Sequence, residues 1–133
     1  MAKSDKTVLI VEDEKELLES YQEIVETAGY NVIPVSDGYQ ALDVLGKRHK
    51  EIDLVLLDLM MLGVDGLEVL KAMRADKVKY GEAPVIILTN MTSESVIRES
   101  FNLGASSYLV KADLDYQGLA KELERYLGEG ESL

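Results

Sequence analysis

The sequence predicts a doubly wound α/β domain built on a five-stranded parallel sheet. Five short apolar runs, rich in β-branched residues, alternate along the chain with five segments whose apolar residues recur with a helical period. Such alternation is typical of parallel strands joined by right-handed crossovers, with helices on both faces of the sheet. The 133 residues are enough for one independently folding core. We expect a single domain with its core over about residues 7–127 and a frayed tail over residues 128–133.

The first part of the chain contains two strand–helix units. Thr7–Val11 is a β-branched run that ends at an acidic pair. The segment after it has one apolar helical face, made by Leu17, Leu18, Tyr21, Ile24, Val25 and Ala28. Asn31–Val35 is predicted at an edge of the sheet, because Pro34 has no N–H to donate to a neighbouring strand. Asp37 is suited to cap the next helix, which ends at the basic residues 47–50.

Three further strand–helix units follow in the same order. The runs at 54–57 and 85–88 contain only apolar residues, which is typical of strands buried on both faces in the middle of a parallel sheet. Ser93 is expected to cap the helix after the second of these strands. Ser107–Val110 is the last and shortest strand, and Asp113 is expected to cap the final helix.

Composition limits the classes of function. The formal net charge is -11, and no block of Lys and Arg balances it, which argues against direct binding to nucleic acid or to an anionic membrane. The chain has no cysteine, so disulfides and thiolate metal sites are excluded. No apolar run approaches the roughly 18 residues of a membrane span, and the N-terminal residues do not resemble a signal peptide. We therefore expect a cytoplasmic protein.

Polar residues follow the C-terminal ends of four of the five predicted strands, namely Glu12 with Asp13, Asp58, Thr89 and Lys111. Taken singly, each has an ordinary explanation as a solvated turn or a surface charge. Their coincidence is more informative, because the C-terminal ends of parallel strands lie at one edge of the sheet, where ligands bind in such folds. If the strand order is 2-1-3-4-5, the first and third strands are neighbours, and Glu12, Asp13 and Asp58 converge.

Three convergent carboxylates require a counter-charge. Two like charges about 4 Å apart repel by roughly 1–4 kcal/mol across plausible effective dielectrics. A hard divalent cation that takes oxygen ligands and keeps some waters fits best, which favours Mg²⁺ with Mn²⁺ as a substitute. The hydroxyl of Thr89 and the ammonium of Lys111 complete a set of groups suited to phosphoryl transfer onto Asp58.

The sequence resembles the receiver domains of two-component response regulators, a CheY-like superfamily with a flavodoxin-like fold, over about residues 7–127. The matching stretches are Val8–Glu14, Asp58–Met61 with Asp65 and Gly66, Val85–Thr89, and Gly104–Lys111. The resemblance implies that Asp58 accepts a phosphoryl group from a histidine kinase or a histidine phosphotransfer protein. It further implies that Glu12, Asp13, Asp58 and the backbone carbonyl of Met60 form the metal site.

The resemblance also implies a conformational switch in a signalling protein that is not an enzyme. Tyr108 would turn inward as Thr89 moves towards the phosphoryl group, whose charge of about -1.5 to -2 repositions the donors around it. The altered surface would comprise the helix after Ser93, the strand 107–110 and the final helix. This surface would bind a downstream protein or form a phosphorylation-dependent homodimer. The ordinary alternative is that Tyr108 is simply a half-buried strand tyrosine.

Two prolines that are usual in the family are missing here. Leu62 stands in the loop after the phosphoacceptor, and Ala112 follows Lys111. A cis bond before a residue other than proline costs about 2.5–4 kcal/mol. We therefore predict a trans Lys111–Ala112 peptide bond.

Met60 and Met91 suggest slow self-dephosphorylation. In the family, the residues two places after the phosphoacceptor and two places after the threonine flank the path of the hydrolytic water. Methionine can shield that path but cannot orient a water well. Asn90 is bulkier than the small residue usual beside the threonine, so we expect it to narrow access for the phosphodonor. The alternative is that the methionines are exposed loop residues with no kinetic effect.

Our main interpretation is a stand-alone receiver, because the chain ends soon after the fifth predicted helix. One alternative is a receiver cut from a larger regulator or hybrid kinase. Another is a pseudo-receiver that acts as a constitutive interaction or dimerisation domain, which the intact set of polar residues argues against. A haloacid-dehalogenase-like phosphohydrolase is disfavoured, because Met60 stands where that class has its general-acid Asp.

Overall fold

The computed structural model describes residues 4–128, and the tail predicted at 128–133 lies outside the described residues except for Gly128. Its centre is a parallel sheet in the order β2-β1-β3-β4-β5, so the predicted fold class is confirmed. The strands are β1 (Thr7–Val11), β2 (Asn31–Val35), β3 (Leu54–Leu57), β4 (Val85–Thr89) and β5 (Ser107–Val110). As Pro34 predicted, β2 is an edge strand.

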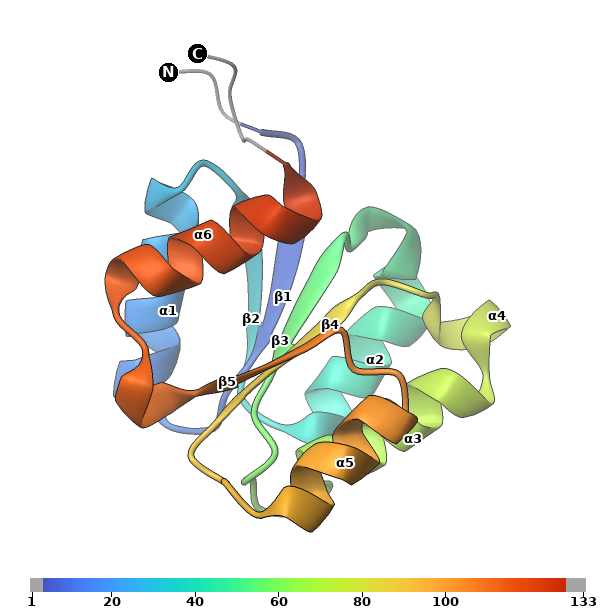
Figure 1. Ribbon diagram of the computed structural model, residues 1–133. Coiled ribbons are helices and arrows are strands. Elements are labelled where there is room, and N and C mark those ends of the chain that lie inside the picture. The colour runs from blue at the N-terminus through green and yellow to red at the C-terminus, as the bar shows by residue number, and fades with distance from the viewer. Residues whose placement is uncertain (1–3, 129–133) are drawn as a thin grey trace.

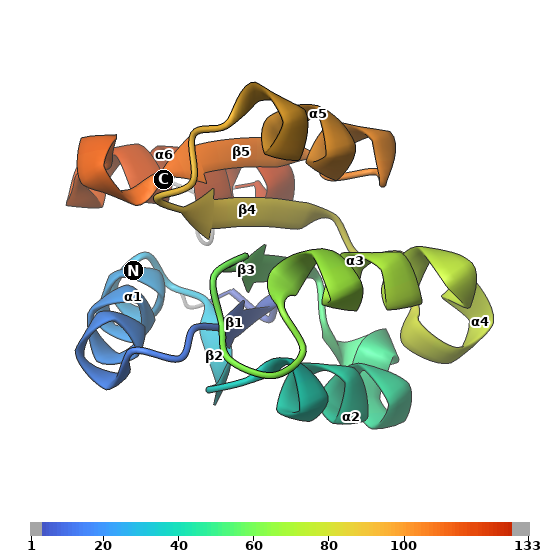
Figure 2. The same cartoon turned by 90° about the horizontal axis from the view of Figure 1, so that it is seen from below.

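Helices cover both faces of this sheet. Figure 2 shows α1 and α6 on one side and α2, α3, α4 and α5 on the other. Two 3₁₀ turns, η1 and η2, follow α2 and β5. The bounds are α1 (Lys15–Thr27), α2 (Gly38–Arg48), η1 (His49–Glu51), α3 (Gly66–Ala75), α4 (Lys77–Tyr80), α5 (Glu94–Asn102), η2 (Lys111–Asp113) and α6 (Tyr116–Leu127). None of the helices within residues 4–128 is long and apolar enough to cross a membrane.

The core consists of two apolar layers, one on each face of the sheet. Alternate strand residues point to opposite faces, so β1 sends Leu9 and Val11 into the layer under α2 and α3, and Val8 and Ile10 into the layer under α1 and α6. Every residue of β3 is buried, as the continuous apolar run predicts. The central strand β3 therefore lies between the two apolar layers, with β1 and β4 on either side of it (Figure 1).

The start of the last helix differs from the prediction. Asp113 does not cap it, because η2 continues the chain for one more turn after β5. Asp115 is the N-cap instead, and its carboxylate accepts a hydrogen bond from the backbone N–H of Gly118 at 2.8 Å. The short helix α4 was also not predicted. Among residues 4–128 no peptide bond is cis, so the prediction of a trans Lys111–Ala112 bond is confirmed.

Candidate functional site

The structure brings three carboxylates together at the C-terminal edge of the sheet. Val11 and Leu57 pair in neighbouring strands, so the residues that follow them, Glu12 and Asp58, lie side by side. One oxygen of each of these carboxylates and one of Asp13 all lie within 4.8 Å of one another. Glu12 is 2% and Asp58 4% exposed, whereas Asp13 is exposed. The cluster therefore has two buried members and one at the surface, and it could hold a metal ion.

Lys111 lies between the two buried carboxylates. Its Nζ is 2.7 Å from Oε1 of Glu12 and 2.9 Å from Oδ2 of Asp58, and its side chain is only 9% exposed. Burial alone would lower the pKa of the Lys111 ammonium, but the hydrogen bonds to Glu12 and Asp58 outweigh burial and raise it. Burial raises the pKa of the Glu12 carboxyl, although the hydrogen bond and the positive charge of Lys111 act to lower it. Lys111 is thus a permanent cation beside Asp58.

The position of Asp58 is fixed by backbone contacts as well. Its Oδ1 accepts a hydrogen bond from the Met60 N–H at 3.1 Å, and its own N–H donates to the Val11 carbonyl at 3.1 Å. The first residue of α3, Gly66, lies directly against it, because a Cβ at position 66 would be 2.2 Å from the Asp58 carbonyl oxygen. Gly66 occurs in a stretch that carried the family resemblance, but sequence reasoning gave it no role.

A pocket of about 350 Å³ opens to solvent beside Asp58. Its lining residues are Asp13, Glu14, Asp58, Met60, Asn90 and Lys111. Met60 and Met91 both line an adjoining groove that also contains Asp13. Met60 therefore lines both the Asp58 pocket and the groove that contains Met91. Thr89 is fully buried, and its Oγ1 accepts a 3.5 Å hydrogen bond from the Met91 N–H.

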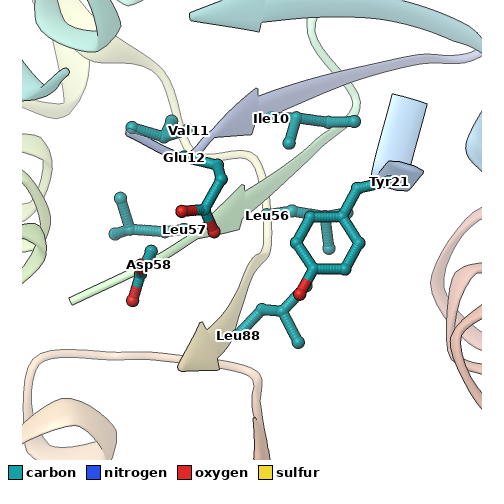
Figure 3. A pocket seen from close by; sticks show the side chains of 8 residues that line it. All are labelled: Ile10, Val11, Glu12, Tyr21, Leu56, Leu57, Asp58 and Leu88. Carbon is teal, nitrogen blue, oxygen red and sulfur yellow. The ribbon is translucent and has the colours of Figure 1, made fainter. Parts of the chain in front are cut away.

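The space behind the carboxylates is dry and apolar. Figure 3 shows Tyr21 projecting from α1 towards the strand ends that carry Glu12 and Asp58. The narrow space that these residues share with Leu56 and Leu88 has no room for a water molecule. Burial raises the pKa of the Tyr21 hydroxyl. Because water is excluded on this side, the charges of the site interact more strongly than they would in solution.

Two side chains connect the loop after β4 to the segment around β5. The hydroxyl of Tyr108 donates to the Met91 carbonyl at 2.7 Å, and the Asn90 Oδ1 accepts from the Ala112 N–H at 2.9 Å. Tyr108 is half-buried, and burial followed by the charge of Asp58 raises its pKa. Sequence reasoning gave Asn90 a role in access only; its contact with Ala112 depends on the path of two loops.

The fold and this strand-edge site together define the class of protein. The family model for the response regulator receiver domain matches residues 8–123, and the chain belongs to that family.

Two curated relatives show how the similarity extends along the chain. The transcriptional regulatory protein CpxR of Escherichia coli (strain K12) is 40% identical over 114 residues, which cover 86% of this chain and 46% of CpxR. The chain thus spans about half the length of such curated relatives. Sporulation initiation phosphotransferase F of Bacillus subtilis (strain 168) is 34% identical over 123 residues, which cover 92% of this chain and 94% of the relative.

Two solved structures have the same fold. The chemotaxis protein CheY4 of Vibrio cholerae matches with a TM-score of 0.82 and 31% identity, covering 93% of this chain and all of CheY4 (100%). A chain of the CheX-CheY-BeF3-Mg+2 complex from Borrelia burgdorferi matches with a TM-score of 0.80 and 28% identity, covering 90% of this chain and 87% of that one.

Proposed function

We propose that this receiver domain accepts a phosphoryl group on Asp58 from a histidine kinase or a histidine phosphotransfer protein. The observation that carries the proposal is the environment of the Asp58 carboxylate. One oxygen accepts from the Met60 N–H and the other from the Lys111 ammonium, and Asp58 lines a pocket that is open to solvent. A buried carboxylate that is held rigidly and remains accessible is suited to act as a nucleophile.

The transfer forms one bond and breaks one. An oxygen of Asp58 forms a bond to phosphorus while the bond from phosphorus to the donor's imidazole nitrogen breaks, and the imidazole takes a proton from solvent. The product is an acyl phosphate on Asp58. Lys111 provides positive charge for the phosphoryl oxygens, and the Thr89 hydroxyl provides a hydrogen-bond donor once it turns towards them.

The metal that fits this site is Mg²⁺, with Mn²⁺ as a substitute. Glu12, Asp13, Asp58 and the backbone carbonyl of Met60 would hold it, since their oxygens are the ligands that such ions prefer. Bound there, the ion supplies positive charge that offsets both the carboxylates and the incoming phosphoryl group. The presence of BeF3 and Mg+2 in the Borrelia burgdorferi CheY complex supports this assignment.

Phosphorylation then alters the surface formed by α5, β5 and α6. The hydrogen bond from Tyr108 to Met91 spans β5 and the loop that leads into α5, so movement of Thr89 would change the position of both. We propose that a downstream protein binds this surface, or that a second copy binds it in a phosphorylation-dependent homodimer. The module acts in the cytoplasm and contacts neither nucleic acid nor membrane, consistent with its net charge of -11.

The phosphorylated form is long-lived in this proposal. Met60 lines the Asp58 pocket and shares a groove with Met91. These side chains shield the acyl phosphate and offer no group that orients a water for hydrolysis. Asn90, which also lines the pocket, narrows the approach of the donor.

A stand-alone receiver is one arrangement compatible with this proposal, since the chain matches 94% of the Bacillus subtilis phosphotransferase. The alternative, a receiver within a larger regulator or hybrid kinase, is favoured by the match to only 46% of CpxR. The phosphoacceptor chemistry is the same in both cases.

Intact-mass spectrometry after incubation with Mg²⁺ and acetyl phosphate tests the proposal. We expect one added phosphoryl group, which is absent without Mg²⁺ and absent in an Asp58→Ala variant. If neither acetyl phosphate nor phosphoramidate gives an adduct, the phosphoacceptor role is wrong, and a pseudo-receiver that acts as a constitutive interaction domain is the better explanation.

A further inference from the structure

The loop after β4 and the turn after β5 are joined by one side chain. The Asn90 Oδ1 accepts a hydrogen bond from the Ala112 backbone N–H at 2.9 Å. Asn90 directly follows Thr89, and Ala112 directly follows Lys111. The contact therefore links the neighbours of the two residues that, in the proposed function, bind the phosphoryl oxygens.

We propose that Asn90 is a positioning residue, whose amide oxygen holds the backbone at Ala112 and thereby sets the position of Lys111 relative to Thr89. The inference rests on the proposed phosphoacceptor function and adds a device for arranging that site. It assigns Asn90 a second role besides the narrowing of the pocket mouth.

The strand pairing explains why a side chain is needed at this point. The register between β4 and β5 ends at the pair Thr89 and Val110, so Lys111 lies beyond the ladder. The backbone there forms the single turn η2, with one hydrogen bond from the Leu114 N–H to the Lys111 carbonyl at 3.2 Å. The hydrogen bond from the Ala112 N–H to Asn90 joins the segments that follow β4 and β5, beyond the last hydrogen-bonded pair of the two strands.

The position of this backbone matters because the lysine side chain is long and has several rotatable bonds. Its ammonium reaches both Glu12 and Asp58 at under 3 Å, which requires a fixed starting point for the chain of methylenes. The hydrogen bond from Tyr108 to Met91 anchors the loop next to Asn90. The backbone next to Asn90 is therefore itself fixed by a hydrogen bond, which limits the movement of the Asn90 side chain.

The hydrogen bond from Ala112 to Asn90 requires the kinds of residue that this chain has at positions 90 and 112. A proline at position 112, the residue usual in the family, has no N–H to donate. A small residue at position 90 could not reach across to Ala112. This chain departs from the family pattern at Asn90 and at Ala112, and these two residues are the acceptor and the donor of the same hydrogen bond.

The rate of phosphorylation by acetyl phosphate, measured by intact mass at saturating Mg²⁺, tests this role. We expect Asn90→Ala and Ala112→Pro each to lower the maximal rate about 3- to 10-fold, the effect of losing one ordinary hydrogen bond. The double variant should be no slower than the slower single variant, because both remove the same contact. The acetyl phosphate concentration at half-maximal rate and the Mg²⁺ affinity should change little.

Two conservative variants separate positioning from other effects. Ala112→Ser keeps the N–H and should match the wild type. Asn90→Asp keeps the acceptor oxygen and should exceed Asn90→Ala in rate when high salt screens its added charge. If Asn90 only narrows the pocket, Asn90→Ala will be faster than the wild type. A faster or unchanged Asn90→Ala rate, or multiplicative effects in the double variant, would overturn the positioning role.

Amide hydrogen exchange at Ala112, followed by NMR in the unphosphorylated protein, tests the contact without relying on phosphorylation. We expect protection in the wild type that is lost in Asn90→Ala and kept in Asn90→Asp. An unprotected Ala112 amide in the wild type refutes the inference even if Asp58 is phosphorylated. Conversely, a protected amide in a protein that takes no phosphoryl group refutes the proposed function, and the positioning role falls with it.

Discussion

Replacing Lys111 with methionine removes the one ammonium that bridges the buried carboxylates. Methionine fills a similar volume, so the change is mainly one of charge. Glu12 and Asp58 are 2% and 4% exposed, and each accepts a short hydrogen bond from Lys111. Removing one partner of such a buried ion pair typically costs about 3–5 kcal/mol. We expect Lys111→Met to lower the free energy of unfolding by this amount at pH 7 without Mg²⁺.

The loss should depend on pH. Burial raises the pKa of Glu12 above its usual value, and without Lys111 that pKa rises further. A group whose pKa is higher in the folded state destabilises the fold as pH rises from the unfolded pKa through the folded one. At pH 4, which lies below the raised pKa of Glu12, this carboxyl is mostly neutral in the folded state, so the loss comes mainly from hydrogen bonds and packing, at about 1–2 kcal/mol. The difference from the wild type should therefore grow between pH 4 and pH 7.

Urea unfolding at pH 4 and pH 7 measures both quantities, and Lys121→Met is the matched control. Lys121 is exposed on α6, so the same substitution there should change stability by less than about 0.5 kcal/mol. Added Mg²⁺ should restore part of the stability of the Lys111 variant at pH 7. An equal loss at both pH values would show that packing, and not charge, is what Lys111 contributes.

Two other substitutions test the backbone contact at Asp58 and the shielding of its phosphorylated form. Gly66→Ala places a Cβ 2.2 Å from the Asp58 carbonyl oxygen, so we expect a loss of at least about 2 kcal/mol in thermal unfolding and slower phosphorylation. Gly46→Ala is the control, because Gly46 lies in mid-helix and its added Cβ would have its nearest neighbour at 3.7 Å. We expect this variant to gain about 0.5–1 kcal/mol of stability. A loss in Gly66→Ala smaller than about 2 kcal/mol would refute the steric argument. Replacing Met60 and Met91 with asparagine should speed loss of the phosphoryl group roughly 10-fold, since one water-orienting hydrogen bond is worth about that factor. An unchanged decay of the phosphorylated mass would end the shielding hypothesis.

The arrangement of the sheet followed from features that act locally and repeat along the chain. The apolar runs at 54–57 and 85–88 favour the middle of a sheet, where both faces of a strand are buried. Pro34 favours an edge strand, because it has no N–H to donate to a neighbouring strand. These constraints agree with the 2-1-3-4-5 order common in doubly wound folds, and a parallel sheet places the residues after each strand at one edge. The convergence of Glu12, Asp13 and Asp58 was therefore foreseeable before any side chain was placed.

The details that could not be foreseen depend on the course of the loops. Asp113 and Asp115 are equally good helix caps in sequence, and only the extra turn of η2 decides between them. The same turn brings the Ala112 N–H within reach of Asn90, although twenty-one residues separate them along the chain. Nothing in the local pattern around either residue indicates that contact.

The charges of the site explain why rigid geometry and cation binding belong together here. Glu12, Asp13 and Asp58, when ionised, outnumber the single ammonium of Lys111, so the site retains an excess of negative charge. A phosphodonor is itself anionic, and its approach to Asp58 is opposed by the carboxylates that surround the nucleophile. Because two of these groups are buried against a dry wall, they cannot turn away into solvent to relieve the repulsion. The repulsion that disfavours the donor also favours binding of a divalent cation. In the proposed function we therefore expect Asp58 to accept a phosphoryl group only when that cation is bound.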